Sequence, residues 1–331
     1  MRDLKFDVII GNPPYQGADG QSQIYPKFVI NALNNTKDYT AMIIPARWYN
    51  GYSSMLDTCR EKLLEEGIQS LDDYTSSEDV FDNVQIMGGI CYYSTKRGYK
   101  GKCRVTNHRK GKSNTAIRDL VCNNNKADNI NIIVRDNIAL SILQKVKADE
   151  SFDYFVSAKD IFKISTIEKG EATNIGGLTP VFVTGNQTDF RGGTLRYFNI
   201  NTNHMEIGVR HFIDKHKIFL YEASDNMLSY PFRVINKPLY GAPGQICNAS
   251  FIVCGPFESE EICQNVITYL CTKFIRCLIF MRKMSQHTSR DTYKFVPIDD
   301  FTHQWNDQML YEKYSLTNEE IDYIENNFKE I

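Results

Sequence analysis

The sequence has nine cysteines, but it has no CxxC pair and no cysteine–histidine cluster at zinc spacing. These absences argue against a structural zinc site and favour reduced thiols in a cytoplasmic protein, several of them acting as small core side chains. The histidines show no metal or triad spacing either, so we expect His204, His211 and His216 to be surface or core residues. We therefore expect no bound metal and no Ser/His/Asp or Cys/His catalytic arrangement.

Long apolar runs and a large net charge are also missing. The start, MRDLKFDVIIG, has an apolar stretch too short for a signal sequence or a membrane span, so we expect a cytoplasmic protein with no membrane association. The formal net charge is −2, which excludes a protein that holds nucleic acid by overall positive charge. Any DNA contact must come from a local basic surface.

What is present predicts two domains, since 331 residues with 42% hydrophobic and 24% charged content can form more than one core. Apolar runs and helical spacing alternate in the first hundred residues. The expected elements are a buried parallel-type strand at Phe6–Ile10 ended by Gly11, helices at Gln23–Leu33 and Ser54–Glu66, and strands at Tyr39–Ile44, Ile68–Tyr74 and Gly89–Ser94. This order is typical of a doubly wound α/β sheet.

The composition changes after Tyr93, with a basic stretch at Lys96–Lys112 and an Asn-rich stretch at Asn123–Asn131. We place the boundary near residue 110, which gives an α/β domain at 1–110 and a mixed α+β domain at 111–331. Short β-like runs such as TPVFVTG, KIFLYEA and ASFIVCG fill the middle of the second domain. A long helix at Glu258–Arg282 and an amphipathic helix at Asn318–Phe328 follow.

The segment Asn12-Pro13-Pro14-Tyr15 follows the first expected strand, where ligands bind in open α/β sheets. Its residues suit methylation of an exocyclic amine, which needs fixed hydrogen-bond acceptors rather than a strong base. The Asn12 amide and the Pro13 carbonyl are two such acceptors, held by the stiff Pro-Pro turn. Tyr15 offers a flat face for a base taken out of the duplex. By itself, however, the tetrapeptide is equally compatible with a plain Pro-rich turn.

In its wider context, FDVIIGNPPYQ resembles the fourth conserved motif of N6-adenine DNA methyltransferases of the restriction-modification type. Further stretches that resemble this family are IYPKFVINAL, YTAMIIPARWYNGY, VQIMGGICYY, KIFLYEA, YLCTKFIRCLIFMRKMSQHTSRDTYKFVPIDDF and LYEKYSLTNEEIDYIE. The resemblance implies a partial Rossmann-like methyltransferase sheet followed by a target-recognition domain, S-adenosylmethionine as methyl donor and double-stranded DNA as partner. It also implies that Asn12, Pro13, Pro14 and Tyr15 are catalytic.

The second wall of the base pocket is expected from Phe81 or Ile86, although such residues are more often plain core. Upstream of Asn12 there is no glycine turn of the form FxGxG, and Gly88-Gly89, Gly176-Gly177 and Gly192-Gly193 do not supply one. We therefore expect the cofactor site to be incomplete. An N-terminal methyltransferase half or a restriction subunit would have to complete it.

A basic and polar cluster after the long helix is a candidate DNA surface, and it could equally be a solvated helix end. The candidate DNA-binding residues are Arg47, Arg282, Lys283, Gln286, His287, Arg290 and Lys294. Trp48, next to Arg47, is either a DNA contact or core.

Three functions fit the sequence. The first is a DNA adenine N6-methyltransferase, or the C-terminal part of one, acting on a flipped-out adenine. The second is a truncated module that binds DNA without methylating it. The third is a protein-contacting subunit of a restriction complex.

Overall fold

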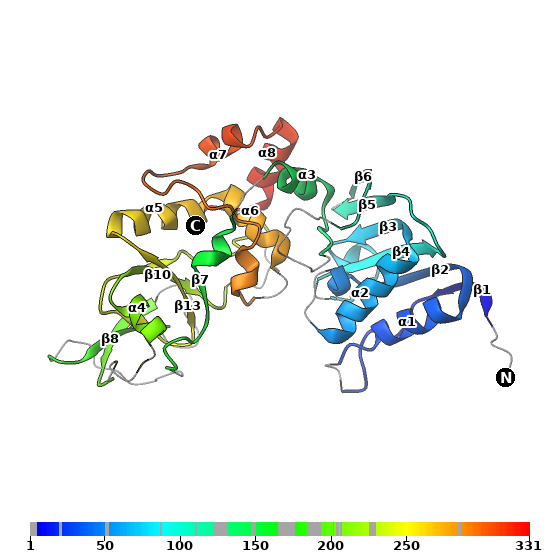
Figure 1. The fold of residues 1–331 in the computed structure, drawn as a ribbon. Helices are drawn as coiled ribbons and strands as arrows, with labels where there is room; N and C mark the ends of the chain where they lie inside the picture. Colours follow the sequence, from blue (N-terminus) through cyan, green and yellow to red (C-terminus); the bar gives the residue numbers. More distant parts are fainter. Residues whose placement is uncertain are drawn as a thin grey trace. The chain divides into compact units, whose positions relative to one another are not determined.

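The computed structural model of the chain describes residues 5–19, 22–49, 53–86, 88–109, 111–121, 132–146, 150–164, 176–184, 193–200, 202, 205, 207–224, 230–283 and 286–331. It forms two compact units, Met1–Ser141 and Ile142–Ile331 (Figure 1). The division lies beyond the expected boundary near residue 110. The reason is that the hairpin of β5 (Cys103–Arg109) and β6 (Lys112–Arg118) extends the first sheet.

Six strands of the first unit form one sheet in the order β1-β2-β4-β3-β5-β6. The remaining four are β1 (Phe6–Gly11), β2 (Thr36–Pro45), β3 (Ile68–Tyr74) and β4 (Ile90–Lys96). β1 pairs with β2 and β3 with β5 in parallel, whereas β4 is antiparallel to both of its neighbours. The sheet is therefore mixed rather than all parallel. Between β3 and β4 the described residues hold only the short 3-10 helix η2 (Ser77–Asp79), and a parallel connection needs a longer crossover.

Two helices, α1 (Tyr25–Asn35) and α2 (Ser54–Glu66), lie side by side against one face of this sheet (Figure 1). Pro26 lies in the first turn of α1, where its missing N–H costs nothing, and Gly67 ends α2 with a φ of +95°. The apolar residues of both helices form a core with Ile44, Leu71 and other residues of this sheet face.

The first strand is present and parallel to its neighbour, as expected, but the expectation that it is buried is wrong. Phe6, Val8 and Ile10 are 54%, 54% and 74% exposed. β1 is the edge strand of the sheet, and among the described residues only β2 pairs with it. An apolar strand of this kind normally has neighbours on both sides.

The second unit contains a four-stranded sheet, β11-β10-β13-β7, and a three-stranded sheet, β12-β8-β9. Its strands are β7 (Val156–Lys159), β8 (Thr179–Thr184), β9 (Gly193–Phe198), β10 (His216–Tyr221), β11 (Leu239–Gly241), β12 (Ile246–Cys247) and β13 (Phe251–Phe257). Its shorter helices are α4 (Ile207–Ile213), α7 (Asp307–Lys313), α8 (Asn318–Asn327) and the 3-10 helices η3 (Phe152–Phe155) and η5 (Arg290–Tyr293). Helix α3 (Asn137–Lys145) spans the division. The expected strands and last helix are confirmed.

The expected long helix is in fact two helices, α5 (Glu260–Cys271) and α6 (Lys273–Arg282), bent by 69°. Thr272 makes the break, because its extended backbone stops α5 while its hydroxyl caps α6 by accepting a hydrogen bond from the Ile275 N–H. No single helix of the described residues is long and apolar enough to cross a membrane, and only this bent pair reaches such a length and composition when taken together.

The cysteines of the described residues are free thiols, and all of them except Cys271 are buried. Burial raises the pKa of Cys59, Cys91 and Cys103 to about 12. These residues are packing groups, as the sequence predicts, whereas Cys122 lies outside the described residues.

Gly67 offers a test of the first unit's packing. A Cβ at this position would lie 2.1 Å from the Tyr99 carbonyl oxygen, whereas a Cβ at Gly98, which also has a positive φ, would meet no atom within 4 Å. Gly98→Ala should lower the free energy of unfolding by roughly 1–2 kcal/mol through its backbone alone. Gly67→Ala should lower it further, as measured by urea denaturation. Equal losses would contradict this packing.

Candidate functional site

The candidate site lies at the edge of the first sheet where three strands end. Strands β1 and β2 are parallel, with Gly11 paired to Met42, so their carboxyl ends meet at this edge. β3 runs in the same direction, because β4 is antiparallel to both β2 and β3. The segments that follow these three strands form the walls of one pocket, as is usual for open α/β sheets.

The first wall is the Asn12–Tyr15 segment, which directly follows β1. Pro13 is buried while the Asn12 side chain is exposed. The chain then turns through a loop closed by an antiparallel bridge between Gln16 and Gln23, and the Tyr15 carbonyl accepts a hydrogen bond from the Ile24 N–H at 3.1 Å. The start of α1 therefore holds the tetrapeptide in place.

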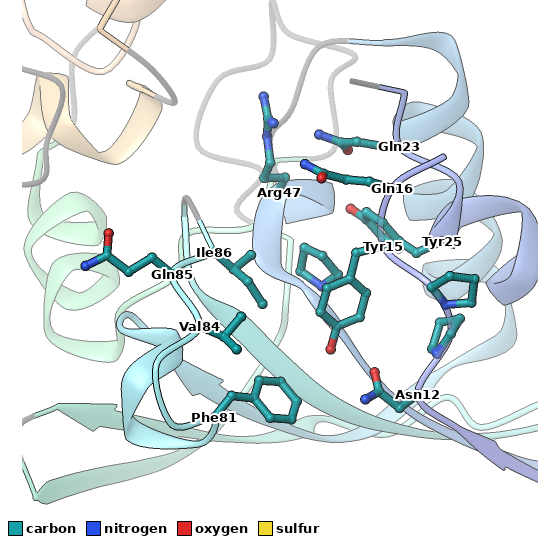
Figure 2. A pocket seen from close by; sticks show the side chains of 13 residues that line it. Asn12, Tyr15, Gln16, Gln23, Tyr25, Arg47, Phe81, Val84, Gln85 and Ile86 are labelled. Carbon is teal, nitrogen blue, oxygen red and sulfur yellow. The ribbon is translucent and has the colours of Figure 1, made fainter. Parts of the chain in front are cut away.

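The opposite wall is the loop between β3 and β4, residues 75–89. Figure 2 shows Phe81, Val84 and Ile86 of this loop pointing across the pocket toward Asn12 and Tyr15. The pocket has a volume of about 850 Å³, within the usual size range of ligand pockets. Its lining residues are Asn12, Pro13, Pro14, Tyr15, Gln16, Gln23, Tyr25, Pro45, Arg47, Phe81, Val84, Gln85 and Ile86.

This arrangement brings the six sequence-predicted catalytic and base-pocket residues together. Contact of Phe81 and Ile86 with a base stays a prediction. The sequence analysis missed Val84, Gln85, Gln16 and Gln23, which lie in loops without a periodic pattern. Val84 is 46% exposed, so the pocket presents an apolar wall to solvent.

The Tyr15 hydroxyl is buried and has no hydrogen-bond partner. Burial, followed by the neighbouring Tyr92 and Cys91, raises the pKa of Tyr15 to about 12. The phenol is therefore neutral at physiological pH. It can offer an apolar face and a donor, and it does not act as a base.

Arg47 lies in η1 (Ala46–Tyr49), directly after β2, and lines the same pocket. With the Gln23 amide oxygen turned toward it, that oxygen accepts hydrogen bonds from Arg47 Nη1 at 2.7 Å and Nε at 3.1 Å. Trp48 is fully buried, so the core interpretation of this residue is the right one. Arg47 is the charged group of the pocket lining.

Two of the basic residues that the sequence predicted on the surface of the second unit are buried in the structure. Arg282 and Lys283 are each only 2% exposed. The Arg282 guanidinium lies 4.9 Å from the centre of the Phe295 ring, and Lys283 Nζ donates to the Val234 carbonyl at 2.5 Å. These two side chains pack inside the second unit and do not form part of an exposed basic surface, and their contact with DNA stays a prediction.

The rest of the cluster is nearer the surface. Gln286, His287 and Arg290 are exposed, with His287 paired to Glu222 at 3.0 Å and Arg290 to Asp153 at 3.2 Å. Lys294 is partly buried and pairs with Asp291 at 2.8 Å. DNA contact by these four residues stays a prediction, and Ser285 and His204 lie outside the described residues.

A hydrogen-bonded Ser-His-Asp chain that the sequence did not indicate is also present. His108 Nδ1 lies 2.9 Å from the Ser113 hydroxyl, and its Nε2 lies 3.1 Å from Asp72. The two ring nitrogens are reversed relative to a serine hydrolase, where Nε2 faces the nucleophile. The His108 ring stacks on Tyr74 at 4.3 Å, and none of these residues lines the Asn12 pocket. The three side chains link the neighbouring strands β3, β5 and β6.

The pocket fits a neutral, flat ligand better than S-adenosylmethionine. That donor carries a carboxylate, which suits a cation, but also sulfonium and ammonium cations and ribose hydroxyls, which favour carboxylate neighbours. The lining residues include no carboxylate, and their charged group is the cation Arg47. Among the described residues there is also no group of three or more side chains suited to a metal ion.

Comparisons with known proteins agree with the motif. Residues 1–81 match the family model described as Eco57I restriction-modification methylase. A protein of Mycoplasma pneumoniae named as an adenine-specific methylase is 39% identical over 120 residues, which are 33% of this chain and 28% of that relative. The match thus spans less than a third of the relative's own length.

Two solved structures have weak similarity. One is the methyltransferase subunit of a type I restriction-modification system from Streptococcus thermophilus, with 18% identity and a TM-score of 0.28 over 36% of this chain and 30% of that one. The other is the type IIL restriction-modification enzyme MmeI in complex with DNA, with 10% identity and a TM-score of 0.40 over 87% of this chain and 46% of that one. The first 81 residues are thus similar to the Eco57I restriction-modification methylase family, and the sequence matches confirm the resemblance to restriction-modification adenine methyltransferases.

Proposed function

We propose that the chain supplies the adenine-binding part of a site-specific DNA adenine N6-methyltransferase of a restriction-modification system. The observation that carries the proposal is the pocket that places Asn12 and Tyr15 opposite Phe81, Val84 and Ile86. A DNA base fits such a pocket only after it leaves the duplex, and stacking on aromatic side chains then offsets part of the cost of unstacking.

The chemistry follows from the acceptors. The Asn12 side-chain oxygen and the Pro13 carbonyl oxygen accept hydrogen bonds from the two N–H groups of the adenine amino group, which keeps both protons until nitrogen becomes cationic. They orient its lone pair and stabilise the positive charge that develops on nitrogen during methylation. The two prolines keep this geometry fixed before the base arrives. Tyr15 and Phe81 stack on the base, while Val84 and Ile86 exclude water.

We further propose that S-adenosylmethionine is the methyl donor and that groups outside this chain's pocket hold most of it. The pocket lining supports this division, because it offers no carboxylate for the donor. The exposed strand β1 supports a partner at this edge, since its backbone and its side chains Val8 and Ile10 can receive a further strand. An N-terminal methyltransferase half or a restriction-complex subunit fits that place.

The absence of a carboxylate from the described lining of this pocket also favours a second function, a DNA-recognition module that does not methylate. Incubating the chain with the product of the neighbouring reading frame, labelled donor and DNA separates the two functions. Methyl transfer to adenine N6 is expected. DNA binding without transfer, with every upstream partner tried, would leave the second function.

Asn12→Ala should lower the methylation rate of that complex by about 10²–10³-fold, the usual effect of losing one preorganised hydrogen-bonding group. DNA affinity should be unchanged, because Asn12 contacts the base only at its amino group. Single-turnover methylation and DNA binding measure the two quantities, with Asn31→Ala, on an exposed position of α1 outside the pocket lining, as the control. A rate within about twofold of wild type would exclude Asn12 from the chemistry.

Tyr15→Phe should keep base binding, because the hydroxyl has no partner, whereas Tyr15→Ala should lose roughly 1–3 kcal/mol of stacking. Since the pKa of Tyr15 is about 12, its phenol stays protonated through pH 10, and the wild type should show no change from Tyr15 ionisation below that pH. Fluorescence of 2-aminopurine at the target position measures base capture. Equal losses in both variants would contradict the stacking role.

Arg290→Gln should weaken DNA binding and reduce the slope of log K against log salt by about 1, the effect of one phosphate contact. Lys62→Gln is the control, because Lys62 is likewise an exposed cation in a surface ion pair, with Glu65. Fluorescence anisotropy over a salt series gives both slopes. If neither variant changes the slope, the exposed cluster of the second unit does not contact phosphate.

A further inference from the structure

An ion pair between the partly exposed Arg135 and the buried Asp73 lies outside the lining of the pocket. Arg135 Nε donates to both oxygens of Asp73, at 2.8 and 2.7 Å, and the Asp73 side chain is only 1% exposed. Burial lowers the pKa of Arg135, but the Asp73 carboxylate outweighs it, so this pKa lies above the usual value and the guanidinium stays charged. Asn107 holds Arg135 from behind by donating to its main-chain carbonyl at 3.0 Å.

The guanidinium of Arg135 binds both ends of the loop at residues 75–89. Its Nη2 donates to the carbonyl of Tyr74, just before the loop, at 2.8 Å, and its Nη1 donates to the carbonyl of Gly88 at 2.6 Å. A Cβ at Gly89 would lie 2.7 Å from Nη2, so the glycine lets the guanidinium approach. One side chain thus closes the loop that carries the second pocket wall.

The loop between these anchors is itself well connected. The buried Ser77 hydroxyl donates to the Val84 carbonyl at 2.6 Å and accepts from the Ile86 N–H at 2.8 Å. The Gly89 N–H donates to the Ile86 carbonyl at 2.9 Å. Val84 and Ile86 therefore keep their places relative to the loop ends, and a shift of those ends carries the apolar wall with it.

The same ion pair also reaches the segment that carries Arg47. The Tyr49 hydroxyl donates to Asp73 at 3.0 Å, and Tyr49 is the last residue of η1. At the other end of η1, the Ala46 N–H donates to the Gly89 carbonyl at 3.0 Å. The ion pair of Asp73 and Arg135 thus contacts both the η1 segment and the ends of the 75–89 loop.

We propose that Arg135, acting with Asp73, is a positioning residue that sets the separation between the 75–89 loop and the Asn12–Tyr15 segment, and so controls capture of a flat base. The guanidinium does not line the pocket and takes no part in bond making. The role of Arg135 in base capture rests on the proposed function, whereas its role in positioning the 75–89 loop is independent of that function.

The key variant is the double substitution Asp73→Asn with Arg135→Gln, which removes the pair without leaving a buried unpaired charge. The amide oxygen that Asp73→Asn introduces can still accept from the Tyr49 hydroxyl. Arg97→Gln is the matched control, because Arg97 binds main-chain carbonyls at the opposite end of the sheet, those of Leu33 at 2.7 Å and Thr36 at 2.6 Å. Both changes remove carbonyl-binding contacts of one arginine in the same unit, and thermal unfolding measures the loss of stability that each causes.

The first readout is amide hydrogen exchange of the full chain without DNA. The double variant should exchange the amides of peptides covering residues 76–89 at least about tenfold faster, the effect of losing one charge-assisted hydrogen bond. Arg97→Gln should leave these peptides unchanged, and Arg135→Lys should be intermediate because a lysine cannot reach both carbonyls in a fixed fork. Unchanged exchange in the double variant would overturn the proposal.

The second readout is the fluorescence of DNA with 2-aminopurine at the target position, using the chain with the partner that gives methylation. The double variant should lose at least about tenfold in base capture, while Arg97→Gln keeps it even at a comparable loss of stability. Normal capture despite a loosened loop would overturn the positioning role. If the wild type captures no base, the proposed function fails, and the hydrogen-exchange result still decides whether Arg135 holds the loop.

Discussion

The parallel pairing of β1 with β2 is the constraint on which the site depends. Its register, from Val8 opposite Tyr39 to Gly11 opposite Met42, brings Asn12 and Pro45 to the same edge of the sheet. A shift of one residue would turn Val8 and Ile10 to the other face and move the tetrapeptide away from the loop that faces it. Backbone hydrogen bonds, rather than contacts between pocket residues, therefore determine where Asn12 stands.

The pocket combines rigid acceptors with an apolar wall and a single cation. Rigid acceptors suit an amine whose lone pair must be oriented, and a general base would be out of place there because the amine loses its proton only after it becomes cationic. The neutral phenol of Tyr15 agrees with this chemistry. In the proposed function the first unit holds the methyl acceptor, and the donor needs carboxylate side chains, which the described lining of this pocket does not include.

The sequence correctly predicted those features that the local chemistry of a single residue determines, such as a helix cap or a turn. Helix α2 begins and ends at the expected residues, because Ser53 caps it and Gly67 stops it, and Pro13 and Pro14 fix the turn after β1. The sequence-based predictions were wrong for features that depend on contacts with residues distant in the sequence. The apolar run of β1 reads the same with one neighbouring strand or two, and the run from Glu260 to Arg282 stays apolar through the bend at Thr272.

The site shows the same limit. Asn12 to Tyr15 are visible as a motif, whereas Val84 and Gln85 belong to a loop whose course depends on Arg135, far along the chain. Arg282 and Lys283 illustrate the opposite error. Their charges resemble a DNA surface in the sequence, but long side chains on a core helix can reach carbonyl groups and aromatic rings inside the fold.

The exposed edge of β1 affects how readily the polypeptide aggregates. A flat apolar strand with free backbone groups pairs with whatever strand it meets, including the same strand of a second copy. The solubility of any polypeptide that leaves this edge uncovered then depends on how soon the edge pairs with a covering segment. Balanced production with a covering segment would protect the protein, and overproduction of the chain alone would favour aggregates nucleated at Phe6, Val8 and Ile10.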